Sequence, residues 1–272
     1  MAEIRTTHAG SLPRPDDLAD MIWRRMDGED VDDAAIEARL DTAVAEVVQK
    51  QRDAGIDVVS DGEQSKTGFS TYVGDRFTGF EGRSEFQADD VADFPELAMR
   101  LFNTPTMAHV VFSNCTGPVE MKDKEAVHKD IERLKSALNG GDGFMGAVSP
   151  GQIAFNYPDQ HYGSHEEYLG ALADALKYEY NAIIDAGLNL QIDSPDMAMA
   201  AHCRSVGSSV GDWHHHLPLA VEALNAALEG IPPEKVRFHV CWGNYGGPHH
   251  KDVPLRDIIE QVYKVNAGTI YP

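Results

Sequence analysis

The feature that most constrains this chain is a helix-to-strand junction that occurs twice. The segments Asp53-Ala54-Gly55-Ile56 and Asp185-Ala186-Gly187-Leu188 each end an amphipathic helix at a glycine and continue into a short apolar run. The first run reaches Asp61 and the second reaches Asp193. A repeated unit of helix, strand and polar strand end is typical of α/β folds, in which helices connect neighbouring parallel strands.

The same alternation extends over the rest of the chain. Asp30 is expected to cap the helix that ends at Gly55, and Ser164 with Glu167 forms a capping box before the second junction. Six βα units and the start of a seventh follow from strands expected near 4–8, 56–60, 107–115, 143–148, 188–192, 236–241 and 268–270, with helices over 124–138 and from about 218 to 228. This order predicts a doubly wound sheet or a TIM barrel in one domain, 1–272, with residues 68–106 as an excursion over one end.

Composition narrows the range of partners. The chain carries 44 Asp and Glu against 23 Lys and Arg, and its net charge of −21 repels nucleic-acid phosphates and anionic lipid. No apolar run approaches the roughly 20 residues of a membrane span, and the first residues lack an apolar signal segment. The chain has three cysteines, an odd and small number that argues against a disulfide framework. We therefore expect a cytoplasmic protein that binds neither nucleic acid nor membranes.

His239 and Cys241 give the sharpest local signal. Because side chains alternate along a strand, both residues lie on one face of the strand expected at 236–241. An imidazole beside a thiol at the C-terminal end of a strand supplies half of a zinc site, which needs a third and usually a fourth protein ligand. On this pair alone, ordinary burial of both side chains is the favoured interpretation.

Carboxylates at strand ends form the second pattern. Asp61, Glu63 and Asp193 fall where the active sites of barrels are assembled. A carboxylate there can hold a substrate ammonium group or act as an acid or base. An aspartate after a strand also commonly forms a turn, and this alternative is stronger for Asp61, beside Gly62, than for Asp193.

Two histidine runs are expected to matter less. His214-His215-His216 follows a stretch rich in glycine and serine and is expected in a solvated loop before a helix. His249-His250 is expected in a loop near the His239 and Cys241 pair and is a secondary candidate for contact with substrate. No Gly-x-Ser-x-Gly elbow is present, so the sequence gives no support for hydrolase chemistry.

Four motifs, in this order, resemble the cobalamin-independent methionine synthase family and its catalytic C-terminal barrel. They are Thr6-Thr7-His8-Ala9-Gly10-Ser11-Leu12-Pro13, Ile56-Asp57-Val58-Val59-Ser60-Asp61-Gly62-Glu63, Gln191-Ile192-Asp193-Ser194-Pro195 and His239-Val240-Cys241. The resemblance covers nearly the whole chain and includes short single-barrel relatives such as epoxyalkane:coenzyme M transferase. It implies a TIM (β/α)8-type barrel of the methionine synthase and uroporphyrinogen decarboxylase kind.

The resemblance also implies a function in methionine biosynthesis. It indicates a zinc-dependent S-methyltransferase of the 5-methyltetrahydropteroyltriglutamate–homocysteine type, which takes a small-molecule thiol and an alkyl donor. Gly10 and Ser11 would hold the carboxylate of the substrate amino acid, and Glu63 and Asp193 would hold its amine. The resemblance names no catalytic acid or base, and a homodimer would be compatible with it.

The implied metal is Zn²⁺, bound by His239 and Cys241. Zinc would hold the substrate thiol as the reactive thiolate. The family's other two ligands, a Glu and a Cys, would lie beyond Pro272, so we expect a barrel truncated in its seventh strand, with the C-terminal strands missing. The family's pterin-packing Trp has no counterpart in residues 149–157, and the lysines with which the long synthases contact polyglutamate are absent. These departures leave the alkyl donor open.

Three other functions stay open at this point. Within the same chemistry, the chain could be an epoxyalkane:coenzyme M transferase or a methyl-corrinoid:thiol methyltransferase. A coenzyme M sulfonate would need a cation near Ser11, which Arg5 or Arg14 could supply, whereas Glu63 and Asp193 suit an ammonium group. The alternative of another class is a non-catalytic barrel that acts as a binding or scaffold protein.

Overall fold

The computed structural model describes residues 4–104, 109–207, 209–210, 212–243 and 247–271, and the structural statements below concern these residues. Its strands are β1 (Phe80–Ser84), β2 (Phe86–Ala88), β3 (Phe112–Cys115), β4 (Phe144–Val148), β5 (Asn189–Asp193), β6 (Cys203–Ser205), β7 (Val236–His239) and β8 (Thr269–Tyr271). Its helices are α1 (Asp16–Met26), α2 (Asp33–Asp53), α3 (Tyr72–Arg76), α4 (Asp89–Ala92), α5 (Pro95–Phe102), α7 (Lys124–Leu138), α8 (Pro150–Asn156), α9 (His165–Asp185), α10 (Asp196–Met199), α11 (Trp213–Ala227), α12 (Leu255–Val262) and the 3-10 turn η1 (Pro233–Lys235).

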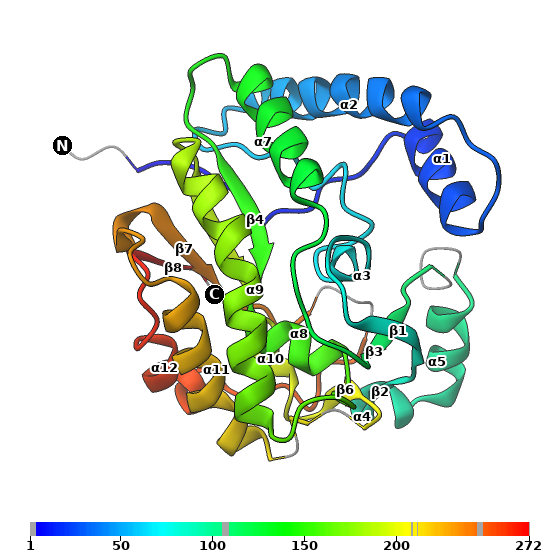
Figure 1. Ribbon diagram of the computed structural model, residues 1–272, viewed down its shortest axis with the longest axis vertical. Helices are drawn as coiled ribbons and strands as arrows, with labels where there is room; N and C mark the ends of the chain where they lie inside the picture. The colour runs from blue at the N-terminus through cyan, green and yellow to red at the C-terminus, as the bar shows by residue number, and fades with distance from the viewer. Residues whose placement is uncertain (1–3, 105–108, 208, 211, 244–246, 272) are drawn as a thin grey trace.

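A parallel sheet in the order β4-β5-β7-β8 forms the centre of the fold (Figure 1). On the other side of β4, Val59 makes a parallel bridge to Gly143, and Thr6 accepts backbone hydrogen bonds from the segment beside Val59. The parallel arrangement predicted for the strands near 143–148, 188–192, 236–241 and 268–270 is therefore confirmed. In parallel neighbours, every strand presents its C-terminal end at the same edge of the sheet.

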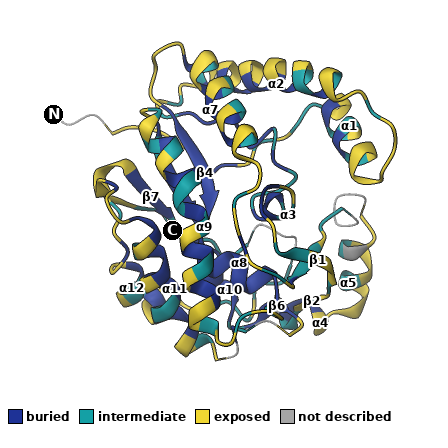
Figure 2. Cartoon of the chain, in the orientation of Figure 1, coloured by how far each residue is buried: buried dark blue, intermediate teal, exposed yellow. Residues whose placement is uncertain are grey.

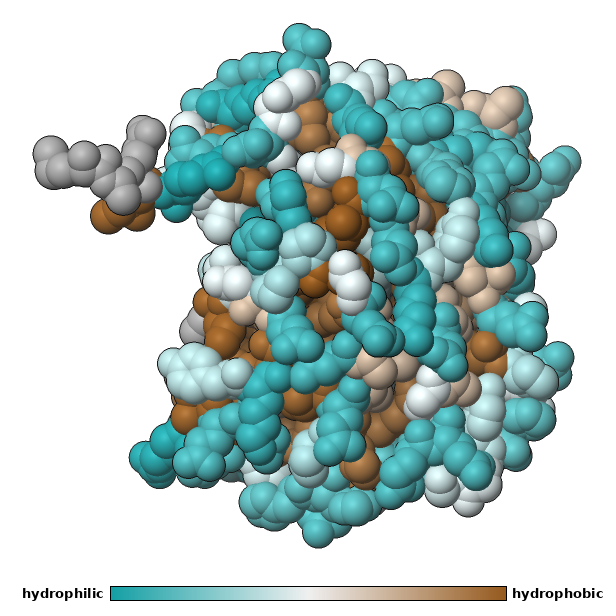
Figure 3. All heavy atoms as spheres, turned by 60° about the vertical axis from the view of Figure 1, so that its left-hand side comes forward, coloured by the Kyte–Doolittle hydropathy of each residue, from teal (hydrophilic) through white to brown (hydrophobic). Residues whose placement is uncertain are grey.

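The helices cover this sheet and bury its side chains. All five residues of β4 are buried, as expected for a parallel strand with both faces covered. Helix α9 packs against α8 and α11, and α2 packs against α7. Figure 2 shows the outer faces of these helices exposed and their inner faces buried, and Figure 3 shows hydrophilic side chains spread among apolar atoms on the surface. In the described part of the chain, no helix is both long and apolar enough to cross a membrane.

Local signals fix the helix ends. The predicted cap of α9 is confirmed, because the Ser164 side chain accepts a hydrogen bond from the Glu167 backbone N–H. The prediction for α2 is wrong by two residues. Asp32, rather than Asp30, caps this helix by accepting from the Ala34 N–H, and Asp32 has the extended backbone that a cap requires.

Four predicted elements differ from the structure. The segments expected as strands near 4–8 and 56–60 form only the isolated bridge at Val59, because the Asp57 and Val58 N–H groups both donate to the Thr6 carbonyl instead of forming a strand ladder. The strand expected at 107–115 is β3, which begins at Phe112 and pairs antiparallel with β1, while residues 105–108 lie outside the described residues. The reason is that the excursion at 68–106 folds back beside β3 and takes up its hydrogen bonds. Helix α11 begins at Trp213 rather than near Pro218, because Asp212 caps it five residues earlier than expected.

Candidate functional site

Asp193 and His239 end two neighbouring parallel strands and face one another. The sheet register pairs the two residues directly, so their side chains leave the same face of the sheet. His239 Nδ1 lies 2.7 Å from Asp193 Oδ1. Burial alone would lower the pKa of His239, but hydrogen bonds from its ring to Asp193 and Cys241 outweigh burial and raise the pKa to about 9.

Cys241 lies two residues beyond the end of β7, on the same side as His239. Its sulfur accepts a hydrogen bond of 3.2 Å from the Gly243 backbone N–H, and its thiol contacts the His239 ring. A carboxylate bonded to one ring nitrogen of a histidine is the arrangement that orients metal-binding histidines, because it leaves the other nitrogen for the metal. The nitrogen and sulfur donors of His239 and Cys241 therefore fit two positions of a zinc site.

Glu63 reaches the same place from a strained turn. Gly62 and Glu63 both have left-handed backbone angles, with φ of 63° and 57°, which is uncommon for a residue other than glycine. The Asp61 carboxylate accepts from the Glu63 N–H, and Arg14 donates to the Glu63 carbonyl oxygen. Burial and, after it, the negative charge of Asp193 raise the pKa of Glu63 to about 7. Strain of this kind is typical of functional sites.

The loop at Gly10 and Ser11 lies against Glu63. The Ser11 hydroxyl donates to a Glu63 carboxylate oxygen, and the Leu12 N–H donates to the Gly62 carbonyl. A Cβ atom on Gly10 would lie 3.0 Å from Glu63 Oε1, tighter than most real contacts, so a side chain here would push the carboxylate aside by a few tenths of an ångström. The glycine is needed for this close approach.

Sequence reasoning missed three residues that hold the carboxylates in place. A Cβ on Gly146 of β4 would lie 3.2 Å from Asp193 Oδ2 and 3.4 Å from Glu63 Oε1, so both carboxylates approach one point above this glycine. Gln191 donates to Asp193 Oδ1 at 3.0 Å, and the buried Lys66 donates to the Gly146 carbonyl at 2.5 Å. Gln191 belongs to the third motif, and its position two residues before Asp193, on the same face of β5, is the one sequence signal of this role. The sequence gives no such signal for Lys66 or Gly146.

The two carboxylates lie on the wall of a cavity of about 880 Å³. The predicted site residues that line it are Gly10, Ser11, Glu63, Asp193, His239 and Cys241. Its other walls are mostly apolar and include Phe69, Phe86 and Phe112. Several of the lining residues belong to 68–106, which confirms the prediction that this segment lies over one end of the sheet.

Asp61, expected beside the other strand-end carboxylates, and His8 of the first motif both lie away from the cavity. His8 bonds to Gln51 at 2.6 Å and packs against the ring of Phe144, at the N-terminal end of β4. Asp61 is fully buried under the turn, where burial and the charge of Asp130 raise the pKa of its carboxyl. Neither residue lines the cavity, and Asp61 has the turn-forming role that was its alternative interpretation.

The prediction of a solvated loop for the three-histidine run is wrong. These residues form the first turn of α11, and His216 is fully buried, with Nε2 3.0 Å from Asp196 Oδ2. His214 and His215 are exposed. His249 and His250 do not line the cavity; they pair instead with Asp252 and Asp93, at 3.0 Å each.

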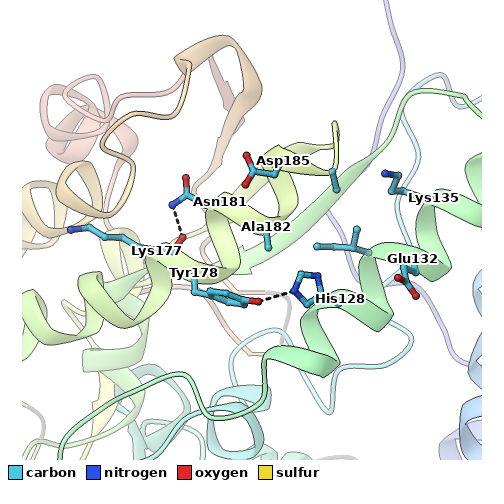
Figure 4. A pocket seen from close by; sticks show the side chains of 10 residues that line it. His128, Glu132, Lys135, Lys177, Tyr178, Asn181, Ala182 and Asp185 are labelled. Atoms are coloured by element: carbon cyan, nitrogen blue, oxygen red, sulfur yellow. Dashed lines mark hydrogen bonds between the residues drawn. The ribbon is translucent and has the colours of Figure 1, made fainter.

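A second hollow lies between the outer faces of α7 and α9 (Figure 4). Its lining includes His128 and Tyr178, which share a hydrogen bond of 2.7 Å, together with Lys135, Lys177 and Asp185. None of the predicted site residues lines it, so the strand-end cavity is the candidate functional site.

Comparison with known proteins identifies a family and several relatives by sequence. The family model described as the catalytic domain of cobalamin-independent synthase matches residues 4–247. The chain is 26% identical over 244 residues to a methionine synthase of Sulfolobus acidocaldarius, covering 88% of this chain and 62% of that protein. It is also 26% identical over 250 residues to 2-hydroxypropyl-CoM lyase of Xanthobacter autotrophicus, covering 90% of this chain and 58% of that protein.

A solved structure shares the fold. It is a B12-independent methionine synthase from a Shewanella species in complex with selenomethionine, which superposes with a TM-score of 0.64 at 22% identity and covers 89% of this chain and 62% of that one. This chain therefore spans about 62% of the length of methionine synthases that it matches, and shares with them an α/β fold of the TIM-barrel type. With the family model matching most of its length, the chain belongs to the family of cobalamin-independent synthase catalytic domains.

Proposed function

We propose that this chain carries the thiol-binding face of a zinc-dependent methyltransferase that moves a methyl group to a homocysteine-like amino-acid thiol. The observation that carries the proposal is the convergence of two carboxylates, Glu63 and Asp193, on one point above Gly146, in the cavity that His239 and Cys241 also line. A substrate with an ammonium group and a thiol fits these two sets of protein groups at once.

The ammonium group is assigned to the space between Glu63 and Asp193. Both carboxylates are buried, and the negative charge of Asp193 disfavours the ionised form of Glu63. A cation placed between them would be paired on both sides, the condition under which burial of charge is favourable. The substrate carboxylate would then lie against the backbone N–H groups of Gly10 and Ser11.

The substrate thiol is assigned to the end of the cavity at His239 and Cys241. These residues would hold Zn²⁺, which supplies a Lewis acid that keeps a bound thiol as thiolate at neutral pH. Asp193 would have two tasks, because its Oδ1 orients the His239 ring while its Oδ2 faces the ammonium position. The apolar walls from the 68–106 segment would exclude water and receive the alkyl donor.

A second candidate function is alkyl transfer involving coenzyme M. Its support is Arg83, a cation on the cavity wall that could pair with a sulfonate, together with the similarity to a 2-hydroxypropyl-CoM lyase. The cations considered from the sequence are already used elsewhere. Arg5 pairs with Asp142, and Arg14 donates to backbone carbonyls of the Glu63 turn.

The proposal is tested by zinc equilibrium dialysis followed by calorimetric titration with homocysteine. Cys241→Ala should lose about one equivalent of zinc relative to the unaltered protein and should bind homocysteine more weakly. Cys115→Ser, which changes a buried cysteine away from the cavity, is the matched control and should change neither quantity. If Cys241→Ala keeps both its zinc and its homocysteine affinity, the proposal is wrong.

A further inference from the structure

A second group of metal-binding side chains lies where three distant segments meet. Asp90 comes from α4, Cys203 begins β6, His202 precedes it, and Asp252 lies in the loop before α12. One ligand atom each from Asp90, His202 and Cys203 lies within 4.8 Å of the others. All three side chains are buried, with exposed fractions of 0%, 4% and 1%. Figure 1 shows α4, β2 and β6 together at this end of the molecule.

The bonding of His202 is what marks this group as a site. Within the described residues, neither ring nitrogen of His202 has a hydrogen-bond partner, and neither does Asp252 Oδ1. Leaving a buried polar group unbonded costs about 1–3 kcal/mol, so such atoms normally have a partner of some kind.

The spacing of the donor atoms suits a small tetrahedral ion. His202 Nε2 lies 3.7 Å from Asp252 Oδ1 and 4.0 Å from Asp90 Oδ2, and Cys203 Sγ lies 3.9 Å from Asp90 Oδ1. Ligands about 2.0–2.3 Å from a tetrahedral zinc ion lie roughly 3.3–3.8 Å apart. Contraction by up to about 1 Å would bring the Asp90, His202 and Cys203 atoms into place, and Asp252 Oδ1, which is close to His202 but outside the group whose ligand atoms all lie within 4.8 Å, would have to move further.

We propose that Asp90, His202, Cys203 and Asp252 form a second, structural Zn²⁺ site, separate from the His239 and Cys241 pair. One nitrogen, one sulfur and two oxygen donors favour zinc over magnesium or calcium, which take oxygen ligands. Four protein ligands leave no open coordination position, which is typical of structural rather than catalytic zinc. Binding releases the Cys203 thiol proton to solvent, and no other bond is made or broken in the protein.

A metal ion at this site would join two segments of the fold. Asp90 belongs to residues 68–106, which cover the cavity, and Asp252 belongs to the loop between β7 and α12, which also contains Cys241. The same two segments are already joined by Lys251, which donates to the Asp89 carbonyl at 2.7 Å and pairs with Asp93 at 2.7 Å. The metal would fix the centre of this contact.

The test uses Co²⁺ as a spectroscopic probe in the Cys241→Ala, Cys115→Ser double variant. Cys203 is then the only cysteine in the sequence, so any thiolate-to-cobalt charge-transfer band must come from it. We expect about one equivalent of Co²⁺ to bind with such a band, about one proton to be released, and Zn²⁺ to displace the Co²⁺. No band, or no binding, overturns the proposal.

Ligand variants in the same background locate the site. His202→Ala and Asp252→Asn should each weaken Co²⁺ binding, whereas His215→Ala, which removes an exposed histidine, should leave it unchanged. Asp252 is partly exposed, so its variant is expected to fold even where a change at His202 does not. If folded Asp252→Asn binds Co²⁺ with undiminished affinity, Asp252 is not a ligand and the four-ligand site is wrong. Because Cys241 is absent throughout, failure here is distinct from failure of the proposed methyltransferase.

Discussion

Two histidine–aspartate pairs in this protein have the same chemistry and opposite surroundings. His239 lies 2.7 Å from Asp193 and lines the large cavity. His216 lies 3.0 Å from Asp196, and the side chains of both residues are fully buried. In the described part of the chain, the buried pair has partners on every side. Asp196 Oδ1 accepts from two serine hydroxyls, and His216 Nδ1 meets His165, whose pKa is lowered to about 4 by burial and by His216.

The difference shows what separates a functional pair from a structural one. The buried pair uses its bonding capacity inside the protein, so it has none to offer to a ligand. The Asp193 and His239 pair leaves one carboxylate oxygen directed at a cavity, and the His239 ring also bonds to the Cys241 thiol, a second donor group that lines the same cavity. Access and unused bonding capacity distinguish the two, since residue type and separation do not. The predictions below test this contrast.

The largest expected effect is on stability, at the buried pair. His216→Ala leaves the buried Asp196 carboxylate without its hydrogen-bond partner at Oδ2 and leaves a cavity where the ring was, and the two effects together should cost about 3–5 kcal/mol of unfolding free energy. Urea denaturation measures the loss. His215→Ala, one residue earlier on the exposed side of the same helix turn, should stay within about 0.5 kcal/mol of the unaltered protein. A similar small value for both variants would show that the buried pair is not structural.

The next effect concerns Glu63 and depends on pH. Its pKa in the folded protein is about 7, above the ordinary value of 4.5, so ionising it in the fold is unfavourable. The contribution of this group to stability is full below pH 4.5 and is lost as the pH rises to about 7. The unaltered protein should therefore lose about 3 kcal/mol of unfolding free energy, relative to Glu63→Gln, as the pH rises from below 4.5 to 8. Urea denaturation across this pH range checks the sign, and Glu96→Gln on the exposed side of α5 should show no such trend.

The smallest effect is a steric one at Gly146. Alanine there places a methyl group close to both carboxylates, in the proposed position of the ammonium group. We expect homocysteine affinity to fall about tenfold, or ~1.4 kcal/mol, in a calorimetric titration. Gly170→Ala is the matched control, because a Cβ on that exposed helical glycine meets nothing within 4 Å. Equal affinity in the two variants would place the ammonium group elsewhere.

The sequence predicted those helix ends and strands that depend on residues close together in the chain. The Ser164 cap, the glycine end of α9 and the strand that leads to Asp193 follow from local spacing, and the structure has all three. His239 and Cys241 share a face for the same local reason. The pairing of Asp193 with His239 then follows from parallel register, once the alternation of helix and strand is recognised.

The remaining features depend on contacts between distant segments. Pro218 suggested that a helix begins there, so His216, two residues earlier, was expected in a solvated loop. In the structure α11 contains Pro218 in its interior, and His216 lies in the first turn of the helix. The antiparallel pairing of β3 depends on where the excursion folds back. Gly146 and His202 carry no local signal, because their roles come from side chains far away in sequence that approach them in the fold.

The most direct test of the account is calorimetric titration of zinc-loaded protein with homocysteine and with coenzyme M, before and after Asp193→Asn. The substitution removes one of the two charges that would hold the substrate ammonium group. We predict that homocysteine binding weakens by about 2–5 kcal/mol, the cost of truncating a buried charge pair, while binding of coenzyme M, which has no amine, is unchanged or stronger. Intact homocysteine affinity in Asp193→Asn would contradict the amino-acid assignment and favour the coenzyme M alternative.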